Sequence, residues 1–221
     1  MEKFTKLLLL ILSITFSATG IYISRMIEPV SIGLTQLESA DAWDIAKPDY
    51  RTLKNGDLIF RHGRGFTSNA FMQMNLNDKQ YSHAGILFIE NEVPIVYHAI
   101  GGEDHPDATI RRDELAYFCN ADLVHGFGIY RLDLSSEQLS KAADLVRSWY
   151  NEGIKFDMDF DLATDQEMYC SEFVYKAIKK AAANENYLSL TRFSGREYVA
   201  CDNLYLNKHA STIYHYQYSN N

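Results

Sequence analysis

The sequence predicts an α+β fold in which an antiparallel β-sheet packs against helices. Residues 84–89 form a continuous apolar run typical of a strand buried on both faces, and a turn at 90–92 leads into a hairpin partner at 94–100. A helix with an apolar stripe is expected between Ser135 and Gly153. Strands and helices are mixed but do not alternate regularly, which favours an antiparallel sheet over a doubly wound parallel one.

Further strands are expected on both sides of that hairpin. Gly56 is a turn residue followed by a short β-rich run to Phe60, and an apolar stretch at 127–132 predicts another strand. Tyrosines alternate with polar residues over 214–218, which predicts a last strand with an aromatic face. These strands would extend the hairpin into a larger sheet.

Two helices can be expected from local signals. Ser135 and Gln138 have the spacing of a capping box, and Gly153 ends the apolar stripe that follows them. A second helix is predicted to start near Cys170, with an apolar stripe and with three lysines toward its C-terminal end, where cations suit the helix dipole.

Composition limits the classes of protein to which the chain can belong. Its 221 residues include 21 basic and 29 acidic side chains, a net charge of −8 that argues against nucleic acid as a partner. A hydrophobic content of 47% is that of a folded globular protein. The three cysteines, Cys119, Cys170 and Cys201, are an odd number without C-x-x-C spacing, so a disulfide framework or a zinc ribbon is excluded.

The N-terminal segment predicts export. Lys3 and Lys6 precede an apolar stretch whose compact core is nearer the length of a signal peptide than the roughly 20 residues of a membrane-spanning helix. An uncleaved anchor that associates with the membrane through residues 7–23 is the alternative. We therefore expect residues 1–23 to be a signal peptide or anchor. Residues 24–221 would form a single domain in the bacterial periplasm or cell envelope.

Cys170 is the cysteine whose position suggests chemistry. At the start of a helix, unpaired N–H groups and the positive end of the dipole stabilise a thiolate, and the same N–H groups can bind the oxyanion of a tetrahedral intermediate. The alternative is a small buried side chain on the inner face of the helix. Cys119 and Cys201 have no such context and are expected to be structural.

A thiolate nucleophile needs a base, and two histidines are the best candidates. His83 opens the buried strand, and His98 lies 15 residues on in its hairpin partner, so the hairpin brings the two close to opposite one another. His98 could then orient His83 as the third member of a triad does. Each histidine alone could instead be structural.

Two metal sites are weaker alternatives. Asp157, Asp159 and Asp161 alternate like the start of a calcium-binding loop, but the glycine and glutamate that such a loop needs are absent. Cys170, His83 and His98 have the residue types of a zinc site, but their spacing matches no zinc motif.

Five segments, in this order along the chain, resemble the motifs of the YiiX/YaeF group of permuted papain-like cysteine hydrolases, which belong to the NlpC-type superfamily. They are Gly56–Phe60, Tyr81–Ile86, Val96–Ala99, Phe156–Asp157 and Tyr169–Tyr175. The histidine motif precedes the cysteine motif, as in the circularly permuted members. The resemblance implies the permuted papain-like fold, with its nucleophile at a helix N-terminus.

The resemblance also implies a set of roles. Cys170 would be the nucleophile, His83 the general base and later acid, and His98 the polar residue that orients His83. Tyr81, Tyr169 and Ser171 would contact the substrate or its oxyanion. No metal or organic cofactor is expected. The YiiX-like group commonly has glutamate in the third place, whereas the acyltransferase relatives have histidine, so His98 leaves the substrate open.

Three functions remain open from the sequence. The first is an exported cysteine amidase or peptidase that acts on cell-wall or related peptides through an acyl-enzyme. The second is an acyltransferase or thioesterase on lipid acyl esters with the same triad, and the third is an inactive binding module. The sequence indicates no oligomeric state.

Overall fold

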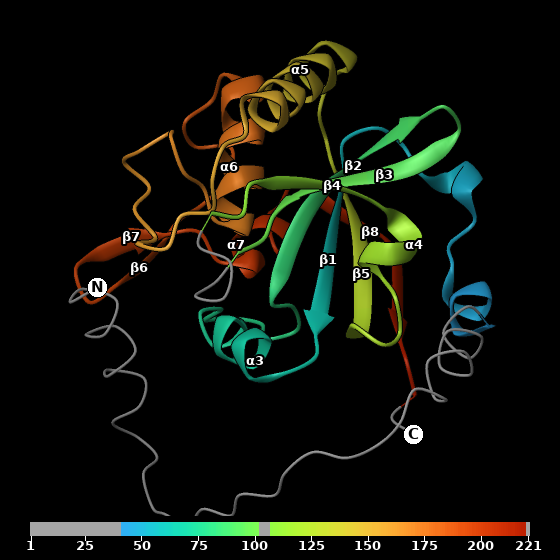
Figure 1. The fold of residues 1–221 in the computed structure, drawn as a ribbon. Helices are drawn as coiled ribbons and strands as arrows, with labels where there is room; N and C mark the ends of the chain where they lie inside the picture. Colours follow the sequence, from blue (N-terminus) through green and yellow to red (C-terminus); the bar gives the residue numbers. More distant parts are fainter. Residues whose placement is uncertain (1–40, 102–106, 220–221) are drawn as a thin grey trace, which may run out of the picture. The chain divides into compact units, whose positions relative to one another are not determined.

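A six-stranded antiparallel sheet forms the centre of the computed structural model, which describes residues 41–101 and 107–219 (Figure 1). Each neighbouring pair of strands in the sheet is antiparallel, as the fold class predicts. In spatial order the strands are β4 (Ile110–Glu114), β3 (Val93–Ala99), β2 (His83–Glu90), β1 (Asp57–Gly63), β5 (Val124–Leu132) and β8 (Ala210–Gln217).

The predicted hairpin is confirmed, with one refinement of its register. β2 and β3 join through a tight turn in which Asn91 and Glu92 have positive φ angles of 50° and 69°. The pairing places Gly85, not His83, level with His98, so the two histidines are diagonal neighbours on one face of the sheet. Burial on both faces ends before Ile89, whose side chain is exposed.

One face of the sheet is covered by helices (Figure 1). Helix α5 (Ser136–Glu152) begins with the predicted capping box and ends at Gly153, and it packs beside α6 (Cys170–Ala182). Side chains of β1 that point to this face, Leu58 and Phe60, share one apolar core with Phe173 and Val174 of α6. Helix α7 (Cys201–Tyr205) also contributes to this core.

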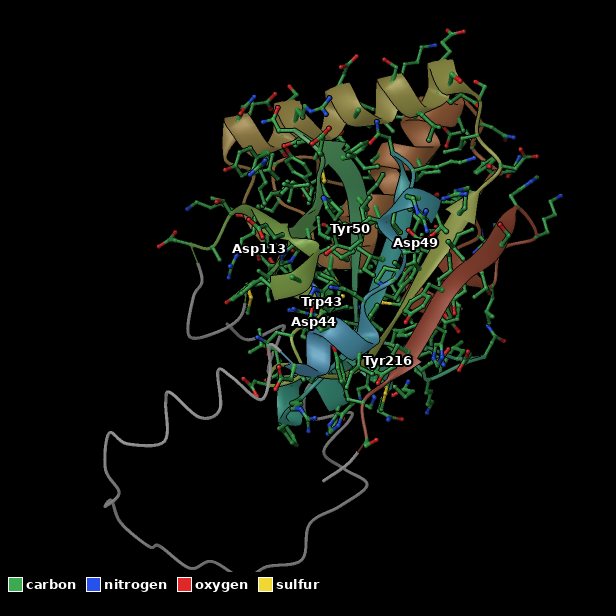
Figure 2. The ribbon with its side chains drawn as sticks, turned by 90° about the vertical axis from the view of Figure 1, so that its right-hand side faces the viewer. Trp43, Asp44, Asp49, Tyr50, Asp113 and Tyr216 are labelled. Carbon is green, nitrogen blue, oxygen red and sulfur yellow. The ribbon has the colours of Figure 1, made fainter. Side chains whose placement is uncertain are left out.

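The opposite face carries a second core. Ile59 and Phe127 lie there with Phe118 of the short helix α4 (Leu115–Phe118). A helical segment at 41–46 closes this face, and the Trp43 ring lies 5.9 Å from that of Phe127. Figure 2 shows Trp43 on this segment and Tyr216 on β8. Because both faces of the sheet are covered, successive side chains of β1 point alternately into the two apolar cores.

Several short elements were not predicted because they lack a clear hydrophobic period. They are the 3₁₀ turn η1 (Tyr50–Thr52), α3 (Phe66–Met72), β4, α4, the hairpin of β6 (Thr191–Phe193) and β7 (Arg196–Tyr198), and α7. The expected signal peptide or anchor lies outside the described residues and stays a prediction. None of the helices in the described part of the chain has the length and apolar character needed to span a membrane.

Candidate active site

The N-terminus of α6 places Cys170 at the edge of a cleft. The helix begins at Cys170 itself, and the carboxylate of Glu172 accepts the backbone N–H of Tyr169 at 3.1 Å, which caps this end. Glu172 is fully buried, and burial raises its pKa to about 7 although Lys176 lies 2.8 Å away. The first turn of α6 is therefore held in place by this cap, and it carries the half-buried thiol of Cys170.

The cleft has a volume of about 360 Å³ and contains the predicted nucleophile and both histidines. Its walls come from elements far apart in sequence, which are β1, α3, β3, β4, the start of α6 and the segment before α7. The fold thus brings Cys170, His83 and His98 together, as predicted from the hairpin and the helix start.

The histidines form a relay that ends on a carboxylate. His83 Nε2 lies 2.9 Å from His98 Nδ1, and His98 Nε2 lies 2.9 Å from Asp113 Oδ2 on β4. An ionised carboxylate only accepts, so it fixes the His98 proton on Nε2 and leaves Nδ1 as an acceptor. His83 must then donate from Nε2. This leaves its Nδ1 lone pair for Cys170.

Asp113 is held ionised by its two neighbours. Burial alone would raise the pKa of Asp113, but hydrogen bonds from His98 and Arg111 outweigh burial and hold the pKa below its usual value. Arg111 Nη2 donates to Oδ1 at 2.9 Å, while Oδ2 faces His98. Asp113 is labelled in Figure 2.

The ring of Phe118 packs against both histidines of the relay. Its ring centroid lies 5.6 Å from that of His83 and 5.0 Å from that of His98, and the guanidinium carbon of Arg61 lies 4.5 Å above it. Arg61 Nη1 also donates to the Phe118 carbonyl at 3.0 Å. Three polar side chains of the cleft are therefore positioned by one fully buried aromatic residue.

The pKa shifts favour a Cys170 thiolate and a neutral His98 ring. A hydrogen bond with the Cys201 thiol is the main cause that lowers the pKa of Cys170; burial opposes it, and the charge of His83 adds to the lowering. Burial lowers the pKa of His83, and the Cys170 thiolate partly opposes that effect. Burial also lowers the pKa of His98 to about 3, so His98 stays neutral.

Cys201, for which the sequence suggested a structural role, lies beside Cys170. It is the first residue of α7, it lines the cleft, and its thiol is the hydrogen-bond partner of Cys170. Cys119, in contrast, lies in the second core, where burial raises its pKa well above the usual value. The sequence did not indicate that two helix starts converge on one cleft, which brings Cys201 to Cys170 while Cys201 also belongs to the apolar core.

The predicted oxyanion residues divide into two groups. Tyr169 and Ser171 line the cleft, but both hydroxyls bind Val199: Tyr169 Oη accepts its N–H at 2.8 Å and Ser171 Oγ donates to its carbonyl at 2.8 Å. These bonds hold the segment before Cys201 against α6. Tyr81 is a correction, because its hydroxyl lies 3.2 Å from Tyr130 Oη inside the aromatic core and does not line the cleft.

The aspartates that resembled a calcium loop have a structural use. The carboxylate of Asp157, which is buried, accepts the backbone N–H groups of Asp159, Phe160 and Asp161 at 2.6–3.0 Å. Its oxygens are therefore occupied, and the loop they fold packs Phe160 against Tyr169. Within residues 41–101 and 107–219, no group of three or more His, Cys, Asp or Glu side chains is placed to hold a metal ion.

Asp113 and Arg61 were missed by the sequence reasoning. Asp113 lies in the charged run of residues 110–114, which looks like an exposed segment until pairing of β4 with β3 places it beside His98. Arg61 follows the apolar part of β1, and its register opposite His83 is the signal that could have placed it in the site.

Comparisons with known proteins agree with this fold. The chain is 30% identical over 134 residues to the Escherichia coli protein YiiX, a match that spans 58% of each chain. A crystal structure of the metalloprotein yiiX from Escherichia coli has a similar fold, with a TM-score of 0.58 and 21% identity over 73% of this chain and 96% of that one.

A family model matches residues 52–200, which include both histidines, Asp113 and Cys170. This range begins just before β1 and ends just before α7, and so contains most of the sheet and both long helices. The chain therefore belongs to the YaeF/YiiX family of permuted papain-like amidase enzymes, family C92.

Proposed function

We propose that this protein hydrolyses an amide bond through a covalent acyl-enzyme on Cys170. The observation that carries the proposal is the relay that runs from a thiol at a helix N-terminus through His83 and His98 to Asp113. Membership of an amidase family supports the same reaction. The arrangement provides a nucleophile, a base and a means of orienting the base, which are the parts that nucleophilic catalysis needs.

The proton of the Cys170 thiol would pass to His83 Nδ1 before the substrate reacts, which leaves the thiolate that the lowered pKa of Cys170 favours. The thiolate attacks the carbonyl carbon, and the backbone N–H groups at the start of α6 stabilise the oxyanion. His83 then protonates the leaving amine, the C–N bond breaks and an acyl-enzyme remains. Water, deprotonated by His83, attacks this thioester and releases the acid and the free thiol.

His98 and Asp113 would act together as the orienting group. A neutral imidazole accepts a hydrogen bond from His83 Nε2 but supplies no negative charge to balance an imidazolium. Asp113 supplies that charge one ring farther away and polarises His98 toward His83. The histidine in the third place thus gains some of the electrostatic support that a carboxylate would give directly.

A peptide of the cell wall is the substrate class that we propose. The positively charged and then apolar N-terminal segment supports export, with the membrane-anchored form as the alternative. The cleft carries polar side chains along with its aromatic ones, including three arginines, and this favours a peptide over a long acyl chain. An acyltransferase or thioesterase with the same triad would need an extended apolar groove.

The test compares the purified mature protein with its Cys170→Ala variant on cell-wall peptide fragments. Wild type should release a new amine and a new carboxylate, and the variant should release neither. Fragment binding by both proteins without cleavage by either would identify a binding module and refute the proposal. Release of fatty acid from lipid esters, with peptides left intact, would support the acyltransferase or thioesterase instead.

A further inference from the structure

The charge of the cleft differs in sign from that of the whole protein. The chain has a net charge of −8, yet the described part of the cleft is lined by three arginines, Arg61, Arg64 and Arg111, against one aspartate, Asp113, and the Cys170 thiolate. Asp113 is already engaged by His98 and Arg111. A concave site with an excess of positive charge and partly apolar walls attracts anions.

Arg61 is the least exposed of the three arginines that line the cleft. It lies directly opposite His83 in the pairing of β1 with β2, and its side chain is half-buried against the ring of Phe118. A guanidinium has five N–H donors, and the hydrogen bond of Arg61 within the described residues uses Nη1 toward the Phe118 carbonyl. Most of its donors therefore remain for another partner.

No carboxylate among the described residues pairs with Arg61. The ion pairs of the protein's other buried or half-buried basic groups contrast with this: Arg131 binds Asp57 at 2.7 Å and Lys176 binds Glu172 at 2.8 Å. Asp113 and the Cys170 thiolate attract Arg61 without forming an ion pair with it. A half-buried guanidinium without a direct ion-pair partner is costly, since the loss of hydration is offset mainly by an opposite charge in contact. A planar anion that binds from solution would supply that opposite charge.

Arg64 extends the positive surface to the mouth of the cleft. Its side chain is exposed, Nε donates to the Ala121 carbonyl at 3.0 Å, and no ion pair with another described residue engages it. Arg64 would attract the anion from solution over a distance that the ionic strength limits. Arg61 would then bind the anion inside the cleft. One guanidinium fork matches the two oxygens of one carboxylate.

We propose that the cleft selects amide substrates that carry a free carboxylate, which Arg61 binds next to the reacting carbonyl. This inference rests on the proposed function in so far as Cys170 is the reacting nucleophile. It adds the substrate class: peptides with a C-terminal or side-chain carboxylate. The matching neutral amides should be poorer substrates.

Iodoacetate and iodoacetamide provide a test that does not need a known substrate. Both alkylate the Cys170 thiolate, which forms an S–C bond while the C–I bond breaks and iodide leaves; they differ only in carboxylate against amide. The measured quantity is the rate constant for iodoacetate divided by that for iodoacetamide at Cys170. This ratio is then divided by the same ratio for free cysteine. Any general effect of Arg61 on thiolate reactivity cancels in this ratio.

We expect the normalised ratio to be about 10 in wild type and to fall about tenfold in Arg61→Gln, since tenfold is the effect of one modest charge-assisted contact. Arg61→Lys, which keeps the charge without the fork, should fall between. Arg51→Gln is the matched control, because Arg51 is exposed and lies outside the cleft, and it should leave the ratio unchanged. A ratio that is equal in wild type and Arg61→Gln would overturn the proposal.

Peptide pairs then identify the source of the carboxylate. One pair differs in a C-terminal carboxylate against a C-terminal amide, and the other in a glutamate against a glutamine side chain. Higher kcat/KM for the acid of either pair, lost in Arg61→Gln, supports the inference and names the source. Stronger preference for a phosphorylated peptide would refute the carboxylate. If no peptide is cleaved while the alkylation ratio still depends on Arg61, the amidase proposal fails and the anion site stands.

Discussion

His98 and Asp113 are joined by a hydrogen bond of 2.9 Å from His98 Nε2 to Asp113 Oδ2, and this bond determines the proton positions of the whole relay. Because the carboxylate accepts from Nε2, His98 Nδ1 is free to accept from His83. The other oxygen of Asp113 accepts from Arg111 at 2.9 Å. The orientation of the group at position 113 is thus fixed from both sides.

Asp113→Asn should reverse the relay. Arg111 will keep the amide oxygen on its own side, so the NH₂ group will face His98 Nε2 and force the proton onto Nδ1. His83 must then accept at Nε2 and carry its proton on Nδ1, where it cannot take a proton from Cys170. We expect kcat to fall by roughly 10²-fold or more, because a reversed tautomer at a catalytic histidine has effects of this size or larger. Amide hydrolysis assays measure it.

The control for this reversal is a double variant. Asp113→Asn combined with Arg111→Met removes the donor that orients the amide, because methionine has no side-chain N–H group, so the amide can rotate and present its oxygen to His98. Activity should then recover in part relative to Asp113→Asn alone. If Asp113→Asn retains full activity, or the double variant is no more active than the single one, the tautomer argument is wrong.

Cys201→Ala should raise the pKa of Cys170. A hydrogen bond from Cys201 is the main cause that lowers this pKa, so the thiolate persists to lower pH than that of an ordinary cysteine. Without the donor, the pH midpoint of Cys170 alkylation by iodoacetamide should move to higher pH. Cys201→Ser keeps an O–H donor and should stay nearer to wild type. Identical midpoints in all three proteins would contradict the assignment.

The parts of the fold that could be predicted are those with local signals. The apolar run of β2, the turn at Asn91 and the capping box at Ser135 depend on neighbouring residues, and each is present in the structure. Helix α6 could be located because its apolar stripe and its lysines agree. The short elements α4 and β4 have no such period, so their positions depend on the sheet that they join.

From the sequence, only the site residues that lie in one hairpin or at the start of one helix could be predicted. Cys170, His83 and His98 follow from those two units. Asp113 lies on β4 and Cys201 on α7. Their positions beside the relay depend on long-range packing that no local sequence pattern encodes. Tyr81 was misplaced for the same reason, since nothing near it in sequence reveals the aromatic core that takes its side chain.

His98 should make the fold sensitive to acid. Its pKa is about 3 in the folded protein and near 6.5 when unfolded, so between these values the unfolded chain binds the extra proton. Stability from this residue is present above pH 6.5 and is lost as the pH falls toward 3. Between pH 7 and pH 4.5 the loss is at most about 3 kcal/mol.

Urea denaturation of wild type and His98→Gln at these two pH values measures this loss. The variant should lose less stability on acidification, since glutamine cannot take up the proton. His209→Gln is the control, because His209 stacks on Tyr187 outside the cleft. An equal acid loss in wild type and His98→Gln would show that the proton is taken up elsewhere.

The ion pair of Asp57 and Arg131 should show an asymmetric cost of mutation. Arg131 Nε and Nη2 each donate to the Asp57 carboxylate at 2.7 Å, and the Lys54 N–H donates at 2.8 Å. Asp57 is fully buried, whereas the Arg131 side chain is 26% exposed. If Asp57 is neutralised, Arg131 can reach water; if Arg131 is removed, the buried carboxylate cannot.

Arg131→Gln should therefore destabilise the fold by about 3–5 kcal/mol, the usual cost of leaving a buried charge unpaired, and Asp57→Asn should cost less. Urea denaturation at pH 7 gives both free energies of unfolding. The rate of Cys170 alkylation should stay within about twofold of wild type in the folded fraction, because neither residue lines the cleft. A larger cost for Asp57→Asn would mean that the hydrogen bond from Lys54, and not the desolvated charge, dominates at this site.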